Sequence, residues 1–487
     1  MNSSSGGRGF SRRGFLTLSG GGAVLSVASQ KMPAGAAGDL TARDKWGGCP
    51  AIRFEATGFF RLEKTDRWWL VSPDGNAFLS YGLNHVGPRV MTTSYNKQFW
   101  AKKFGVDPNA GLEVFRPGFE AKVQSDLKYL GMNSVGCHSS TGWFSHSFVP
   151  YVYTVRAVNI CHYMSPTGTR NVGNREEDFL DVFADDFVQH CERIARREVA
   201  PRKDDPYLLG YSMTDCPVLT EWEALPRDNN IFGVRRPGTP TWPKVLRNLG
   251  QNNPGKRVYV ETMRRLYHND IKAFNNTYNT AFQSFDDLLR AVRWRLVADP
   301  GNSREARDNR EFLVKIVDRC FEVEVAAIRR YDSNHLIFGD KFNGNTDVPD
   351  EIVALHGKHF DLMFFQYYAN WYDIKRLLNR FQRITGKAAF HGDSSYSVPK
   401  KEMPNPYGPH CVNQQVRAER FRESFQGAFA RKDFVGWNWC GWLEYWAALR
   451  PDKQHSGVQD AFGKWDQPLA DEMMKFSRRL YQVAVAG

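Results

Sequence analysis

Residues 207–215 read YLLGYSMTD, a short apolar run that ends on a threonine and an aspartate. Such a run predicts a buried strand. Similar runs recur along the chain and alternate with longer helical stretches, for example Phe312–Tyr331, where apolar residues repeat every three or four positions. This alternation is the βαβ pattern of a parallel sheet. The eight predicted strands are Ala77–Asn84, Met132–His138, Tyr151–Asn159, Tyr207–Thr214, Leu336–Phe342, Asp361–Tyr367, Ala388–Asp393 and Phe434–Trp439.

Eight strands of this kind predict an α/β fold, a (β/α)8 barrel. Residues 58–82 read as short strands joined by turns, with Asp74-Gly75 as a hairpin signal, so a β-hairpin segment should precede the barrel. The span 220–310 is too long for a simple crossover, and we interpret it as a helical insertion after strand four. With no internal repeat and no linker visible, residues 37–487 are expected to form one catalytic domain.

The N-terminus carries an export pattern. Ser11-Arg12-Arg13-Gly14-Phe15-Leu16 resembles the twin-arginine signal, and small residues before Ala37 suit signal peptidase. We expect residues 1–36 to be a signal peptide and the mature chain to be periplasmic or secreted. A disordered basic N-terminus is the alternative. The apolar runs fall short of the roughly 20 residues that a membrane-spanning helix needs, so no stable membrane insertion is expected.

Composition favours a folded protein and leaves its ligand open. The 487 residues are 42% hydrophobic and 24% charged. Aromatic residues make up 14%, which suits either stacking on sugar rings or a large aromatic core. The net charge of +12 is scattered, so a solvated surface is the default and an anionic polysaccharide the weaker option. No nucleic-acid-binding motif is visible, and the eight cysteines lack zinc-ligand spacing and are expected to be mostly buried thiols.

In a barrel of this type the functional groups lie at the carboxyl ends of the strands. Those ends hold polar, aromatic and acidic residues without a glycine-rich phosphate loop, a GxSxG elbow or an HExxH helix. Histidines at strand ends are interpreted as hydrogen-bond donors, so neither a metal nor a cofactor is expected. The strand-end residues are Asn84, His85, His138, Asp215, Lys341, Asn343, Gln366, Tyr367, Tyr368, His391 and Asp393.

Two of these residues suggest glycosidic bond cleavage. That reaction needs one carboxyl group to protonate the leaving oxygen and a second to attack the anomeric carbon or to activate water. Asp215 at the end of strand four and Asp393 at the end of strand seven each place one carboxyl group at the carboxyl end of the barrel, its mouth. We expect this pair to be catalytic and the partner to be a carbohydrate. Helix capping or a structural salt bridge is the alternative for each acid.

The chain also resembles the agarase-like glycoside hydrolases, a family of (β/α)8 retaining enzymes. The matching stretches run along nearly all of the mature chain, and the resemblance implies the barrel and a glycosidase activity on a poly- or oligosaccharide. They are Gly58-Phe59-Phe60, Arg67-Trp68-Trp69-Leu70-Val71-Ser72-Pro73-Asp74-Gly75, Gly82-Leu83-Asn84-His85, Leu130-Gly131-Met132-Asn133, Tyr207-Leu208-Leu209-Gly210-Tyr211, residues 330–340 and Ser456-Gly457-Val458-Gln459-Asp460.

The chain departs from the family at the two catalytic positions. Where such enzymes carry a strand-four Glu, this chain has Cys216, with Asp215 one residue earlier, and Asp393 stands for the strand-seven Glu. Three outcomes follow. The enzyme retains the anomeric configuration with an altered approach of the substrate, or a wider distance between the two carboxyl groups gives inversion, or the protein binds glycans without cleaving them. An acid from a loop is a further option, with Glu444 favoured over Glu221 and Glu223.

Other residues are assigned to substrate binding by position. Asn84, His85 and His138 are expected to bind sugar hydroxyls, and Tyr367 to donate a hydrogen bond that keeps Asp393 ionised. Four tryptophans are candidate stacking platforms, with core packing expected to claim about half of them. The remaining candidates are Lys341, Trp371, His391, Trp437, Trp439, Trp442 and Glu444.

Overall fold

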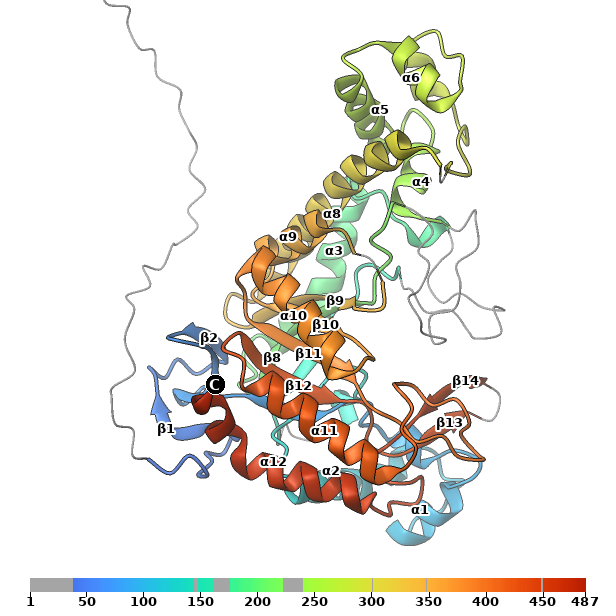
Figure 1. Cartoon of the computed structure of the whole chain (residues 1–487). Helices are drawn as coiled ribbons and strands as arrows, with labels where there is room; N and C mark the ends of the chain where they lie inside the picture. The colour runs from blue at the N-terminus through green and yellow to red at the C-terminus, as the bar shows by residue number, and fades with distance from the viewer. Residues whose placement is uncertain are drawn as a thin grey trace, which may run out of the picture.

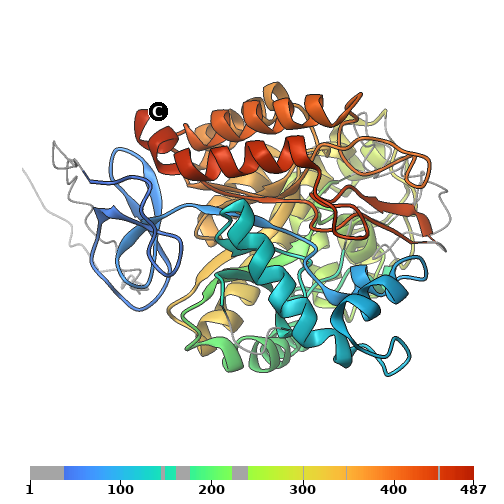
Figure 2. The same ribbon diagram turned by 90° about the horizontal axis from the view of Figure 1, so that it is seen from below.

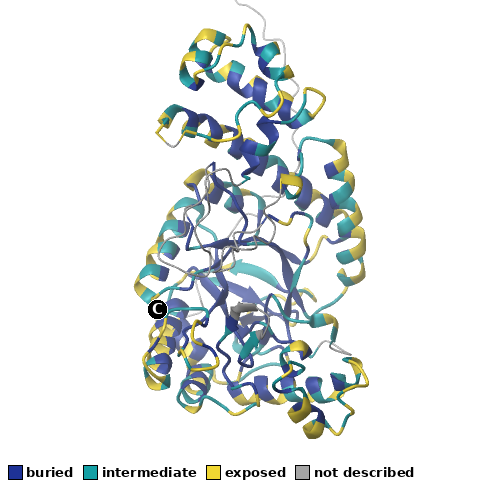
Figure 3. Ribbon diagram, turned by 90° about the vertical axis from the view of Figure 1, so that its right-hand side faces the viewer, coloured by how far each residue is buried: buried dark blue, intermediate teal, exposed yellow. Residues whose placement is uncertain are grey.

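The computed structural model describes residues 38–143, 148–160, 176–221, 240–299, 301–346, 348–447 and 450–487. Within them, eight parallel strands close into a barrel in chain order, which confirms the predicted fold class. Figure 3 shows the buried strands ringed by helices. The signal peptide predicted for residues 1–36 lies outside the described residues. The barrel strands are β5 (Ser80–Leu83), β6 (Ser134–Val135), β7 (Tyr151–Thr154), β8 (Leu208–Asp215), β9 (Leu336–Asn343), β10 (Met363–Gln366), β11 (Ala389–Ser394) and β12 (Phe434–Trp439).

Amphipathic helices cover the outside of the barrel (Figure 1). In the long helix α8, the predicted three- and four-residue spacing places Ile316, Cys320, Val323 and Ala327 in the core. The helices that cover the barrel are α1 (Lys97–Phe104), α2 (Arg116–Leu130), α3 (Asp185–Glu198), α8 (Ser303–Tyr331), α9 (Asp350–His359), α10 (Trp371–Thr385), α11 (Gln414–Phe429) and α12 (Gln467–Ala486).

The predicted helical insertion follows β8, the fourth barrel strand. It comprises α4 (Trp242–Arg247), α5 (Pro254–Leu266), α6 (Ile271–Tyr278) and α7 (Phe285–Arg290), which lie together at the far end of α8 in Figure 1. Aromatic residues hold these helices to α8, for example Tyr259 against Phe312 at 5.2 Å between ring centroids. The buried Arg247 donates a hydrogen bond to Asn309 at 3.0 Å.

A small antiparallel sheet precedes the barrel, where the sequence predicts a β-hairpin segment. Its strands lie in the order β1-β4-β3-β2. Figure 2 shows the sheet at one end of the barrel, opposite the hairpin β13–β14. Trp46 and Phe60 join a buried cluster with barrel residues such as Leu336, so the sheet closes the floor of the barrel. The strands are β1 (Cys49–Arg53), β2 (Arg61–Lys64), β3 (Trp68–Val71), β4 (Asn76–Phe78), β13 (Tyr445–Ala447) and β14 (Arg450–His455).

Aromatic rings fill the barrel interior above this floor. Phe338, Phe364 and Phe390 pack within 5.8 Å of one another, so the interior is a packed core rather than a channel. A Cβ on Gly392 would lie 2.4 Å from the Phe364 ring. The glycine therefore lets that ring fill the barrel directly beneath Asp393.

Two further expectations concern the membrane and the cysteines. Among the described residues, no helix has both the length and the apolar sequence needed to cross a bilayer. The seven described cysteines are buried free thiols, as predicted, and Cys161 lies outside the described residues.

Candidate active site

Side chains from six of the eight barrel strands converge at the carboxyl end of the barrel. Asn84 and His85 follow β5, His138 follows β6, and Asp215 ends β8. The others are Lys341 on β9, Asp393 on β11 and Cys440 after β12. These strand ends meet because parallel strands present their carboxyl termini at one face of the barrel. The structure thus brings together both acids that the sequence analysis selected.

Lys341 lies between the two acids. Its Nζ is 3.0 Å from Oδ1 of Asp215 and 3.5 Å from Oδ2 of Asp393. These two oxygens therefore lie no farther apart than the sum of the two distances, about 6.5 Å. The side chains of Lys341 and Asp393 are 2% and 3% exposed, so the charges are largely shielded from water. Burial makes this pairing necessary, because an unpaired charge in such a place is strongly disfavoured.

Asp393 is surrounded by donors. The Asn84 amide donates to Oδ1 at 2.6 Å, and Nε2 of His85 lies 3.6 Å from Oδ2. Burial alone would raise the pKa of Asp393, but the positive charge of Lys341 and the contact with His85 outweigh burial and hold this pKa well below its ordinary value. Asp393 is therefore ionised, the state that a carboxylate nucleophile needs.

Asp215 has a similar set of partners. Nε2 of His138 lies 3.3 Å from its Oδ2, and the Cys216 thiol donates to its Oδ1 at 3.4 Å. Burial opposes ionisation, but Lys341 and His138 lower the pKa of Asp215 below its ordinary value. His138 also lies 3.1 Å from Lys341 Nζ and 3.9 Å from Asp393 Oδ2, so it contacts every charged member of the cluster.

Three residues of the mouth have left-handed backbone conformations. The φ angles are 56° for His85, 63° for His138 and 51° for Cys216. Such angles are uncommon for residues other than glycine, and they gather at functional sites where the surrounding structure imposes them. Three of them after strands β5, β6 and β8 support a functional role for this face of the barrel.

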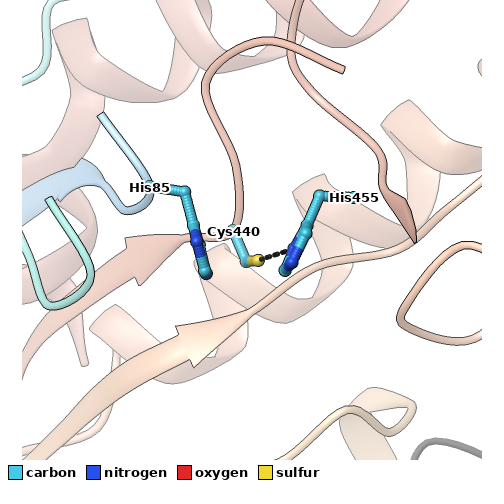
Figure 4. A group of neighbouring side chains, drawn as sticks. All are labelled: His85, Cys440 and His455. Atoms are coloured by element: carbon cyan, nitrogen blue, oxygen red, sulfur yellow. Dashed lines mark hydrogen bonds between the residues drawn. The ribbon is translucent and has the colours of Figure 1, made fainter. Parts of the chain in front are cut away.

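A second cluster adjoins His85. Cys440 follows β12, and His455 ends β14; Nδ1 of His455 is 3.3 Å from the Cys440 Sγ. The rings of His85 and His455 lie 4.3 Å apart (Figure 4). Two groups of possible ligand atoms occur among the described residues, each within 4.8 Å: one is His85, Cys440 and His455, and the other is His85, His138 and Asp393.

Several predicted substrate-binding residues lie elsewhere. Trp437, Trp439 and His391 are completely buried on the helix side of the barrel wall, where Trp437 stacks on Phe425 at 4.3 Å and on His391 at 4.3 Å. The strand alternation that puts Trp437 and Trp439 on one face is correct, but that face is the outer one. The structure therefore contradicts the assignment of Trp437 and Trp439 to sugar stacking and of His391 to substrate binding.

The other two tryptophans are also removed from the acid pair. Trp442 is buried and donates a hydrogen bond to Asp126 on α2 at 2.7 Å. Trp371 begins α10, and its indole packs against Gly427 on α11. Core packing thus accounts for Trp437, Trp439 and Trp442, and Trp371 is partly buried against α11, whereas about half of the four were expected in the core.

The remaining candidates also differ from expectation. Glu444 is buried and forms an ion pair with Lys400, and Glu221 forms one with Arg310. Glu223 lies outside the described residues. Tyr367 lines a surface hollow of about 620 Å³ next to arginines of α10. It is the following residue, Tyr368, that packs with Cys440 close to the acids.

Sequence reasoning missed the Cys137 thiol and the histidine on the hairpin, and it noted Cys216 only as the residue at the position of the family's strand-four Glu. Cys137 directly precedes His138, and its Sγ is 3.3 Å from Lys341 Nζ. Cys216 follows Asp215, so both thiols were detectable as neighbours of predicted site residues. His455 lies in a hairpin after the last barrel strand, and the strand pattern contains no signal for it.

A closed parallel barrel with polar groups gathered at its carboxyl end defines the class of (β/α)8-barrel proteins. No known protein-family profile matches the chain. β-Agarase B of Vibrio sp. (strain JT0107) is 18% identical over 517 residues, which cover 93% of this chain and 51% of the relative. The chain therefore spans about half the length of that relative.

Solved structures show the same likeness. An exo-β-agarase superposes with a TM-score of 0.72 at 16% identity, covering 92% of this chain and 68% of the other. The agarase AgWH50C gives 0.71 at 17% identity, covering 91% and 68%. At these identities the likeness establishes the shared fold, and it extends the resemblance to agarases across nearly the whole chain.

Proposed function

We propose that this protein is a glycoside hydrolase that cleaves O-glycosidic bonds of a poly- or oligosaccharide. The observation that carries the proposal is the pair Asp215 and Asp393, both in contact with Lys341 at the carboxyl end of the barrel. The similarity to agarases agrees with it. An agar-type galactan is therefore the first substrate to test.

Asp393 is assigned the attack on the anomeric carbon. Asn84, His85 and Lys341 all contact its carboxylate and favour the ionised form. These same contacts fix the direction in which the carboxylate faces. An oriented, ionised carboxylate is what a retaining glycosidase requires of its nucleophile.

The leaving-group oxygen needs a proton, and Asp215 with His138 is assigned that role. Asp215 is ionised beside Lys341, so it holds no proton of its own in this arrangement. His138 Nε2 lies 3.3 Å from Oδ2 of Asp215 and orients this carboxylate. A substrate that displaces Lys341 would remove the charge that keeps Asp215 ionised, and the carboxyl group can then hold the proton that it gives to the leaving oxygen.

The separation of the acids favours retention. Retaining enzymes hold their carboxyl groups about 5–5.5 Å apart, and inverting enzymes about 6.5–9.5 Å apart. The upper limit of about 6.5 Å set by Lys341 lies at the lower edge of the inverting range. Inversion is the alternative stereochemical outcome. A substrate that displaces Lys341 would let the two carboxyl groups move farther apart, towards the separation of inverting enzymes.

A glycan-binding protein without hydrolysis is the second candidate. The ion pairs of Lys341 with both acids favour it, because they satisfy the carboxylates that catalysis would use. The hollow beside Tyr367 is lined by Arg376, Arg380 and Arg383, which suits anionic sugars in either case.

The deciding experiment incubates the protein with agar, carrageenan, fucose- and arabinose-rich polymers and other sulfated glycans. Reducing ends and bound glycan are both measured. For the enzyme, Asp393→Asn and Asp215→Asn abolish release of reducing sugar and keep binding, while Asp318→Asn on the outer face of α8 changes neither. Binding without release by the wild type on every glycan supports the second candidate. Full activity of both variants refutes the carboxylate pair.

Export through the twin-arginine pathway is proposed from residues 11–16. Replacing Arg12 and Arg13 by lysine should retain the protein in the cytoplasm. Wild-type protein recovered outside the cytoplasm should begin at Ala37. Export of the variant at the wild-type level would contradict this route.

A further inference from the structure

His85, Cys440 and His455 form a compact group of nitrogen and sulfur ligands at the edge of the barrel mouth. Their ligand atoms all lie within 4.8 Å of one another, and Cys440 and His455 are buried. Figure 4 shows Cys440 between the two imidazoles. The three residues come from separate places: the end of β5, the end of β12 and the end of the hairpin strand β14.

We propose that this group binds a zinc-type divalent metal ion. Zinc takes imidazole nitrogen at about 2.0–2.1 Å and thiolate sulfur at about 2.3 Å, with tetrahedral geometry. Two such ligands then stand roughly 3.3–3.6 Å apart. The 3.3 Å between Cys440 Sγ and His455 Nδ1 is a few tenths of an ångström shorter than the roughly 3.6 Å that these bond lengths give for one nitrogen and one sulfur ligand, so a small shift of His455 completes the geometry. Three protein ligands is the number that zinc sites with an exchangeable fourth position use.

The hairpin β13–β14 is held in the position that the site requires. The backbone N–H of Tyr407 donates to the Gln454 carbonyl at 2.8 Å, and that of Asn405 donates to the Gln454 side chain at 2.7 Å. On the other side, Val458 donates to the carbonyl of Gly441 at 3.2 Å. His455 is thereby fixed over Cys440 by neighbours in the chain, so binding needs little rearrangement of the backbone.

Asp393 supplies the outer contact that metal-bound histidines usually have. Its Oδ2 lies 3.6 Å from Nε2 of His85. A small approach of the two groups would form the hydrogen bond that orients a metal-bound imidazole and increases its affinity for the metal. The ion would thus lie one imidazole away from the proposed nucleophile.

The charge of the mouth also suits a cation. With neutral histidines, Asp215, Asp393 and Lys341 together carry one excess negative charge in a buried site. A divalent ion with a Cys440 thiolate adds one positive charge. The whole cluster then becomes neutral, which reduces the cost of burying its charges.

This site replaces the expectation that no metal is bound. The sequence shows no zinc-ligand spacing because residues 85, 440 and 455 are brought together only by closure of the barrel and folding of the hairpin. A bound ion would join strands one and eight to the hairpin across the seam where the barrel closes. The proposal concerns binding of the ion and is independent of glycan hydrolysis.

The test is a titration of the full chain with Zn²⁺ after removal of metals by a chelator, with a competing indicator dye. The wild type should bind about one ion per chain. Cys440→Ser and His455→Ala should each weaken binding more than about 100-fold, beyond the usual effect of an outer contact. His268→Ala is the matched control, because His268 is exposed, has a similar left-handed backbone and lies in the insertion.

A second measurement begins with the wild type, so its first result does not depend on the folding of a variant. Co²⁺ added to the metal-free wild type should give a thiolate-to-metal charge-transfer band in the near ultraviolet, which Cys411→Ser retains and Cys440→Ser lacks. Zn²⁺ should displace Co²⁺ and remove the band. If wild type shows no such band, or if Cys440→Ser binds Zn²⁺ as tightly as wild type, the site does not exist.

Discussion

The Nζ atom of Lys341 lies 3.0 Å from Asp215 and 3.5 Å from Asp393, so one buried cation holds both acids of the barrel mouth. This arrangement makes the lysine the member of the site whose loss affects both acids at once. It also links the proposed chemistry to the stability of the protein.

Replacing Lys341 by methionine should destabilise the protein and abolish hydrolysis. The change leaves two buried carboxylates close together without their cation, a loss of about 3–5 kcal/mol in the free energy of unfolding. Urea unfolding at pH 7 measures it. Lys358→Met, which breaks an exposed pair with Asp318, should cost less than about 1 kcal/mol. Equal effects of the two changes would show that Lys341 does not pair as described.

Asn84→Ala should reduce kcat more than it raises KM. The substitution removes the 2.6 Å hydrogen bond that orients Asp393, and a hydrogen bond to a charged group contributes about 1.5–3 kcal/mol. The expected loss is roughly 10- to 100-fold in kcat on whichever glycan the wild type cleaves. A pure rise in KM would instead assign Asn84 to substrate binding.

Glu444→Gln should leave activity within a few-fold of wild type. The Glu444 carboxylate is buried against Lys400, and no described contact joins it to Asp215 or Asp393. Initial rates and a melting curve check this. Loss of activity comparable to that of Asp393→Asn, with unchanged stability, would restore Glu444 as a catalytic acid.

Trp437→Ala should act on stability alone. The indole is fully buried between the barrel wall and α11, so its removal should cost about 3–5 kcal/mol. The folded fraction should keep the wild-type KM. A raised KM in the folded fraction would show that Trp437 touches the sugar after all.

Asp340→Asn should flatten the dependence of stability on pH. Burial raises the pKa of Asp340 to about 7, above the value of about 3.9 in an unfolded chain, although hydrogen bonds from Thr214 act in the opposite direction. Between these values the folded protein keeps a proton that the unfolded chain has lost, so stability is full below about pH 4 and falls as the pH rises towards 7. Burial and Asp340 also raise the pKa of Glu324 on α8.

Urea unfolding at pH 5 and pH 8 measures this effect. The wild type should lose roughly 2 kcal/mol more than Asp340→Asn between the two conditions. Asp204→Asn, an exposed surface change, should follow the wild type. Parallel curves for Asp340→Asn and wild type would contradict the raised pKa.

The sequence predicts the barrel well because each strand is a local apolar run with a clear boundary. All eight predicted runs overlap an observed strand, with ends that agree to within a few residues, and the acids Asp215 and Asp393 lie where strand ends were expected. The sequence does not predict whether a strand's side chains point into the barrel or towards the surrounding helices. Trp437 and Trp439 alternate correctly with their neighbours, but the sequence does not say which face meets α11.

Long-range partners are the second part that the sequence leaves undetermined. Lys341 appears only as one more polar residue at a strand end, and its position between two acids depends on the closure of the barrel. His455 meets Cys440 only because a hairpin folds back over strand eight. Both contacts join segments that carry no common local pattern.

The floor of the barrel also constrains how the protein is made. The Arg67 guanidinium, on the small sheet, hydrogen-bonds to the carbonyls of Arg431 and Phe434, at 3.1 Å and 3.0 Å, and to that of Ala484. Its partners are therefore the eighth barrel strand and the final turn of α12. During synthesis these segments are made later than the small sheet, so the sheet waits without its buried partners until α12 has been made. Native packing of this floor therefore requires α12, and a nascent chain stalled before α12 would expose the aromatic side of that sheet.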